Sequence, residues 1–274
     1  MYEEFKIPAI TPEYLEECRQ KAYKDDRENP NNFSNWNSHI KSYGYFKKCK
    51  LVSNQIFTIE EVDKLQETDC IDDVDWDIIN EVLKPTLQKM EPYKKYFIKN
   101  GCFSNKYDFS TCIATKETLA ENLWKINYES AMYDTGGNTE LVVREIIPYN
   151  EEKIPTIYNG MPLREEVRCF YDMDSKKLLY IEDYWNYDYC NDKIRNKTDN
   201  IIFNWFHNKV RTRHEQHMQI LNQLKRKIED NIDSLEFDGE LHRSMEYRFY
   251  VCNRTRYWRI IFNRYGSRNT ECLL

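Results

Sequence analysis

Helical spacing of apolar residues marks three segments of the chain, and a capping pattern marks the start of a fourth. Hydrophobic side chains recur every three or four positions in residues 76–90, 115–131 and 203–232, which predicts amphipathic helices. Thr58 and Glu61 have the spacing of a capping box, so a short helix is expected to begin there. Helices with one apolar side need a surface to pack against.

Strand patterns lie between these helices. Residues 94–99 predict a short strand, and 140–147 form a continuous apolar one. Residues 164–172 alternate strictly, which places Glu166 and Arg168 on one face, and 176–185 predict the hairpin partner. The order of helices, strand, helix, antiparallel strands, long helix and further strands predicts an α+β fold.

Composition and charge narrow the class of protein. Of the 274 residues, 41% are hydrophobic and 15% aromatic, which is typical of a folded globular chain. A formal net charge of -6 gives no overall reason to expect nucleic acid. The nine cysteines form no C-x-x-C pair, and no signal peptide or membrane-spanning run is expected. We therefore expect a cytoplasmic protein with reduced thiols and no membrane partner.

A first candidate site follows the strand at 94–99. Lys99 is predicted to leave the strand, and the polar loop after it presents Ser104 and Lys106. Cationic and hydroxyl groups in this arrangement suit a polyphosphate, although the Walker A pattern is absent. A strand end followed by a solvated loop is the alternative interpretation.

Paired charges on the later strands leave two interpretations open. Arg144 and Glu145 are neighbours on one strand, and Glu166 and Arg168 share a face of another. Such charges often form a cross-strand ladder of ion pairs. They could equally be arginines aimed at a phosphate and held by carboxylates.

The remaining candidates are weaker. His207, His214 and His217 lie on the helix predicted at 203–232, but His214 and His217 are three residues apart rather than four and have no evident carboxylate partner. We expect a solvated helix there and no metal site. The basic polar face of 209–227 makes an RNA-binding protein a minor hypothesis.

Three of these segments together resemble a known family. In order, "FIKNGCFSNKYD", "LVVREII" and "EEVRCFYD" are similar to motifs of the ATP-grasp superfamily. The likeness is to the branch that includes the eukaryotic chaperone for assembly of translation initiation factor 2, with its phage and bacterial relatives. It implies an ATP-grasp domain at 93–274, after an N-terminal region at 1–92. It also implies mainly antiparallel sheets and ATP between two α+β subdomains.

The resemblance implies roles for individual residues. Lys99, Ser104 and Lys106 would hold the phosphates of ATP. Arg168 would face the phosphates from its strand, and Lys106 and Arg168 would act in catalysis. The segment that borders adenine would comprise Arg144, Glu145 and Ile146. Active members use Mg²⁺ and transfer a phosphoryl group to a carboxylate, which implies a parent activity of ATP-dependent ligation.

The end of the chain departs from the family pattern. Residues 247–274 hold six arginines and no lysine, and "MEYRFYV" and "YWRIIFN" stand where the family has metal-binding acids. No metal ligand is therefore assigned. If Arg248 and Arg264 are encoded by AGA codons, a one-base shift of the reading frame gives aspartate at both positions, at the family spacing. We hypothesise that residues 245–274 are translated out of frame, which resequencing the gene would test. The alternative function is a catalytically inactive binding or assembly module that acts on a protein partner.

Overall fold

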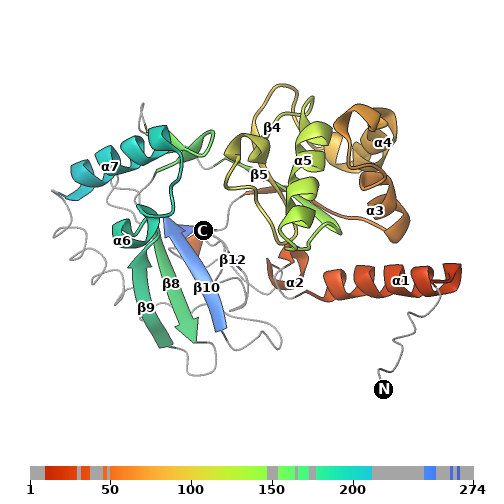
Figure 1. Ribbon diagram of the computed structural model, residues 1–274, viewed down its shortest axis with the longest axis horizontal. Coiled ribbons are helices and arrows are strands. Elements are labelled where there is room, and N and C mark those ends of the chain that lie inside the picture. Colours follow the sequence, from red (N-terminus) through yellow and green to blue (C-terminus); the bar gives the residue numbers. More distant parts are fainter. Residues whose placement is uncertain are drawn as a thin grey trace, which may run out of the picture.

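The chain folds into two α+β halves, which lie side by side in Figure 1. The computed structural model describes residues 10–29, 32–37, 46–47, 50–146, 154–163, 166–172, 177–211, 244–250, 260–261 and 264–265. Only the backbone is described for Trp36, for 210–211 and for strands β1 and β8 to β12. The N-terminal half lies on the right of Figure 1 and the C-terminal half on the left.

In its described residues, the N-terminal half combines five α-helices with a four-stranded antiparallel sheet in the order β2-β5-β3-β4. Its helices are α1 (Pro12–Glu28), α2 (Phe33–Asn37), α3 (Ile59–Leu65), α4 (Trp76–Leu87) and α5 (Leu119–Met132), with two 3-10 turns, η1 (Ile71–Asp73) and η2 (Phe109–Cys112). Its strands are β2 (Leu51–Ile56), β3 (Tyr96–Asn100), β4 (Ile113–Ala114) and β5 (Glu140–Glu145).

The C-terminal half contains a second four-stranded antiparallel sheet in the order β12-β10-β8-β9. Its strands are β8 (Glu166–Asp172), β9 (Lys177–Asp183), β10 (Ser244–Tyr250) and β12 (Arg264–Tyr265). A small hairpin, β6 (Thr156–Ile157) with β7 (Met161–Pro162), and the helices α6 (Tyr187–Cys190) and α7 (Lys197–Arg211) accompany it. In the described residues only β1 (Phe46–Lys47) and β11 (Ile260–Ile261) pair in parallel. The predicted α+β class with mainly antiparallel strands is confirmed.

Local sequence signals explain where several elements begin. The predicted capping box opens α3, because Thr58 Oγ1 accepts from the Glu61 N–H and Glu61 accepts from the Thr58 N–H. Asp75 caps α4, because its side chain accepts from the N–H groups of Asp77 and Ile78.

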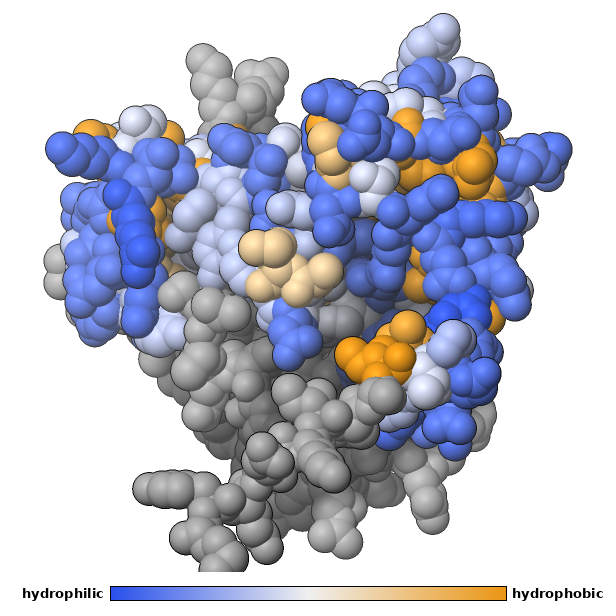
Figure 2. All heavy atoms as spheres, turned by 45° about the vertical axis from the view of Figure 1, so that its right-hand side comes forward, coloured by the Kyte–Doolittle hydropathy of each residue, from blue (hydrophilic) through white to orange (hydrophobic). Residues whose placement is uncertain are grey.

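The surface over this part of the molecule is mostly hydrophilic, with hydrophobic residues in small separate groups (Figure 2). These helices therefore bury their apolar sides.

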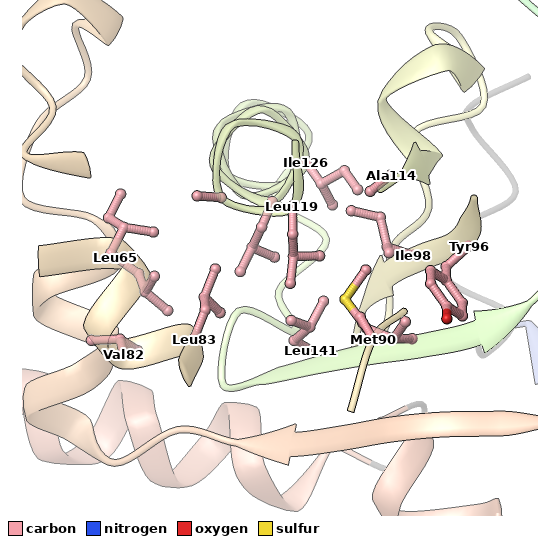
Figure 3. Close-up of a cluster of buried hydrophobic side chains, with 14 of the residues drawn as sticks. Leu65, Val82, Leu83, Met90, Tyr96, Ile98, Ala114, Leu119, Ile126 and Leu141 are labelled. Carbon is pink, nitrogen blue, oxygen red and sulfur yellow. The ribbon is translucent and has the colours of Figure 1, made fainter. Parts of the chain in front are cut away.

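A hydrophobic core fills the space between α3, α4, α5 and one face of the first sheet. Figure 3 shows these side chains between α5 and the strands. The sheet contributes Ile98, Leu141 and Val143, all fully buried. A smaller core in the other half gathers around Phe203 and Trp185. Each half thus has its own apolar centre.

The strand register divides the first sheet into two chemically different faces. Because side chains alternate along a strand, Ile98 and Val143 point to the helices while Lys99 and Arg144 point to the opposite face. We call this opposite face the cationic face; Glu140 and Val142 also lie on it. All four of these residues are buried.

Some predicted boundaries need correction. The stretch 27–39 is rich in Asn, Pro and Ser, which is typical of a loop, but α1 runs to Glu28 and α2 occupies Phe33–Asn37. The α1 helix itself and β2 carry no strong pattern and were not predicted. The long helix begins earlier than expected, at Lys197, and 212–232 lie outside the described residues. No helix in the described part of the chain is long and apolar enough to cross a membrane.

Candidate functional site

The centre of the candidate site is Lys99, the fourth residue of β3. Its side chain is only 3% exposed, because the neighbouring strand β5 and the loop after β3 surround it. Burial, together with the positive charge of Arg144, lowers the pKa of Lys99 to about 8. Within the described residues no group accepts a hydrogen bond or forms an ion pair with the Lys99 ammonium.

Arg144 lies on the same face, one strand away. The register pairs Phe97 with Arg144 and Lys99 with Val142, so the two cations are diagonal neighbours on β3 and β5. The guanidinium carbon of Arg144 is 4.8 Å from the centre of the Phe97 ring, which fixes its position. Both charges are therefore held at one place on the cationic face.

The loop after β3 carries Ser104 and Lys106. Ser104 and Asn105 are buried, and the backbone carbonyl of Asn105 accepts a hydrogen bond from Cys112 at 3.4 Å. Lys106 is half-buried, with its Nζ 5.6 Å from the centre of the Tyr184 ring. Burial raises the pKa of the Cys112 thiol to about 12, and Lys106 opposes this shift, which indicates that the Lys106 charge is near that thiol.

Glu145 and Ile146, which the resemblance places beside adenine, are less buried than Lys99 and Arg144. Glu145 ends β5 in an ion-pair cluster, with Lys50 at 2.8 Å and Lys94 at 3.2 Å. Hydrogen bonds from Lys50 and Lys94 lower the pKa of the Glu145 carboxyl. Ile146 follows directly and is half-buried. The structure thus places Glu145 in the kind of charge ladder that the sequence left as one of two interpretations, while its role toward adenine stays a prediction.

Arg168 is described by its backbone alone. In the second sheet its Cα pairs with Glu182 on β9 and with Arg248 on β10. Whether Arg168 joins Lys99 and Arg144 in one site remains a prediction. Of the three histidines on the predicted long helix, His207 packs against Tyr187, with the ring centres 4.5 Å apart. His214 and His217 lie outside the described residues.

Sequence reasoning missed the buried acid of the cationic face. Glu140 is fully buried, and its carboxylate accepts from the N–H of Ser34 at 3.2 Å. Arg27 approaches the same carboxylate at 3.7 Å. An acid at the first position of β5, directly before the apolar run 141–143, was the available signal, but its partners are far away in the sequence. In the described part of the chain, no three His, Cys, Asp or Glu side chains come together as a metal site.

Comparison with solved structures finds proteins of similar fold. No family model matches the chain, and no curated protein matches its sequence. The chain is similar to a solved structure entitled "Structure of Cdc123 from Schizosaccharomyces pombe", with 13% identity and a TM-score of 0.45. The alignment covers 91% of this chain and 87% of that chain. A similarity at this level concerns the arrangement of elements and assigns no activity.

Proposed function

We propose that this protein binds ATP, with the phosphates of the nucleotide at the cationic face. The observation that carries this proposal is the buried Lys99 ammonium, which lacks an acceptor in the described part of the chain and lies beside a second buried cation. Buried cations are normally paired, because removing an unpaired charge from water is costly. A polyphosphate supplies several anionic oxygens at once and would offset that cost.

Burying the charged Lys99 ammonium destabilises the ligand-free protein. Its pKa is about 8 instead of the ordinary 10.5. A difference of this size corresponds to roughly 3 kcal/mol against the charged form at neutral pH. Proteins tolerate such unfavourable groups mainly at functional sites.

The other candidate residues fit the same ligand. Arg144 would add a second, planar donor to the phosphates, and Ser104 with Lys106 would approach from the loop. Glu145 and Ile146 would border adenine at the end of β5. When bound, ATP supplies a transferable phosphoryl group, and ligation to a carboxylate or similar acceptor is the parent activity that we propose. Residues that would hold Mg²⁺ are not assigned, because the described residues bring no suitable donor set together.

A binding or assembly module without phosphoryl transfer is the second candidate function. The observation that favours it is the register of the second sheet, in which Arg248 lies directly opposite Arg168. Like charges opposite each other are unfavourable, and the family resemblance would put a metal-binding acid on this strand. With arginine at that position the chain would keep nucleotide binding and act on a protein partner.

Calorimetric titration with ATP tests the binding proposal. We expect Lys99→Met to weaken ATP binding by at least about tenfold, because it removes a charge-assisted contact. The matched control is Lys84→Met, which removes an exposed lysine of α4 that pairs with Glu81. Equal affinity of the wild type and Lys99→Met would refute the proposal.

The pH dependence of binding gives a second readout. Above pH 8 the free protein holds Lys99 largely neutral, so binding to phosphate must take up a proton. ATP affinity should then fall with rising pH, by at most about tenfold per pH unit. In Lys99→Met this slope should vanish.

Turnover distinguishes the two candidate functions. The printed chain and a frame-restored chain, which carries aspartate at positions 248 and 264, are compared for Mg²⁺-dependent ATP hydrolysis. Turnover in the restored chain alone supports a ligase whose end is out of frame. ATP binding without turnover in both chains supports the module.

A further inference from the structure

The C-terminal end of α1 lies against a turn that supports the loop after β3. The carboxylate of Asp26 accepts hydrogen bonds from the N–H groups of Gly137 and Thr139, the second at 3.2 Å. The carbonyl of Gly137 in turn accepts from the N–H of Gly101 at 2.8 Å. A continuous series of contacts therefore runs from α1 to a residue two positions after Lys99.

The turn at Gly136 and Gly137 leaves no room for a side chain. Gly137 has a positive φ of 89°, and a Cβ added there would lie 2.5 Å from the backbone nitrogen of Cys102. Gly136, also with a positive φ, lies directly beneath the Asp26 carboxylate. The turn is thus closely packed between α1 on one side and the loop on the other.

Asn32 contacts the same loop from a second direction. Its side chain is fully buried, and its Oδ1 accepts a hydrogen bond from the Cys102 thiol at 3.2 Å. Its Nδ2 donates to the backbone carbonyl of Asp26. A Cβ on Gly101 would come within 2.0 Å of Asn32 Oδ1, so the loop backbone and the amide are in direct contact.

A third contact joins this segment to the cationic face itself. Both oxygens of the Glu140 carboxylate accept from the Ser34 N–H, and Arg27 lies 3.7 Å away. The charge of Glu140 acts on Lys99 and partly opposes the lowering of its pKa by burial. The end of α1 and the start of α2 are therefore bonded to both the loop and the sheet.

The α1 helix is attached by polar contacts. None of its residues is buried, although the helix has 17 residues. Its middle is anchored by Arg19 to Asp63 and by the Tyr23 hydroxyl to the carbonyl of Phe57 at 2.7 Å. An element with little buried apolar surface has low local stability, so its attachment depends on these bonds.

We propose that residues 26–29 and 32–34 form a clamp that fixes the loop 101–106 in the conformation that receives the phosphates of ATP. Asp26 and Asn32 are then positioning residues, which act on the ligand only through the loop and Lys99. This inference rests on the proposed ATP site. It gives the N-terminal segment a role in the site, and it means that detaching α1 weakens ATP binding.

Two clamp variants and one matched control test the inference. Asp26→Asn and Asn32→Ala each remove a contact to the loop or its supporting turn, whereas Lys21→Met removes an exposed lysine that pairs with Asp25 within α1 and does not anchor the helix. Hydrogen exchange of the 101–106 amides is measured without ligand, and ATP affinity is measured by calorimetry. We expect exchange about tenfold faster and affinity about tenfold weaker in both clamp variants. The control should match the wild type in both measurements.

The pattern of results decides the proposal. Loop exchange unchanged in both folded clamp variants would overturn the clamp. Faster exchange with wild-type ATP affinity would overturn the positioning role. A wild type that binds no ATP refutes the proposed function and the positioning role with it, while the exchange data still decide whether the clamp exists.

Discussion

The two faces of the first sheet are buried to the same depth and have opposite chemistry. Toward the helices, Ile98, Leu141 and Val143 are 0% exposed and belong to the hydrophobic core. On the cationic face, Lys99, Glu140 and Arg144 are 3%, 0% and 5% exposed. Because side chains alternate along a strand, the same segments, β3 and β5, build both faces.

The helix side of the sheet stabilises the fold, whereas we assign function to the cationic face. Each apolar side chain on the helix side adds favourable burial, whereas Lys99 on the other side is held against the cost of desolvation. Depth of burial is therefore a poor guide to the role of a residue here. The sign of the stability change when a side chain is removed distinguishes the two faces.

The largest effect is expected on the helix side. Leu141→Ala should lower the free energy of unfolding by about 2–5 kcal/mol, because it opens a cavity in the core. Urea denaturation measures the change. The control is Ile56→Ala on β2, where the side chain is 49% exposed and little burial is lost. A loss at Leu141 as small as the loss at Ile56 would mean that this face is not the stabilising one.

Lys99→Met should have the opposite sign. At pH 7 we expect the variant to be more stable than the wild type by up to roughly 3 kcal/mol, because the buried charge is gone. Burial lowers the pKa of Lys99 from 10.5 to about 8, so between these values the unfolded chain binds a proton that the folded chain does not. The free energy of unfolding of the wild type should therefore rise from pH 8 to 10.5, while Lys99→Met lacks this increase. The difference in stability between the two proteins should close over this range.

Denaturation of both proteins at pH 7 and pH 10 measures this gap. Lys84→Met, on the exposed side of α4, should show no such pH-dependent difference. If Lys99→Met is less stable than the wild type at pH 7, the ammonium has a compensating partner within the protein. The cationic face would then be structural, and the comparison between the two faces would lose its functional meaning.

How far the sequence predicts these two faces depends on the distance between interacting residues. The capping box at Thr58 and the strand over 140–147 rest on neighbours within a few positions, and both predictions are confirmed in kind. Lys99 and Arg144 were selected by residue type and strand position, and the structure puts them on one face.

The contacts of the clamp were beyond such reasoning. Asp26 lies 111 residues before Gly137, and Ser34 lies 106 residues before Glu140. No local pattern links residues so far apart. The short α2 helix was missed because its sequence, FSNWN, contains no strong helix former, and its position is set by the contacts of Ser34 and Asn35.

The smallest effect concerns the polar contacts on the helix side of the sheet, where every group involved has a partner. The buried Thr86 hydroxyl of α4 lies 3.0 Å from Ser53 Oγ and donates to Gln55 Oε1 at 2.7 Å. Thr86→Val keeps the shape but leaves these partners unsatisfied, so we expect a loss of about 1–2 kcal/mol in urea denaturation. The double variant Ser53→Ala, Thr86→Val removes both hydroxyls and should recover part of that loss. A gain in stability from Thr86→Val alone would contradict the comparison, because removing a polar group would then stabilise both faces of the sheet.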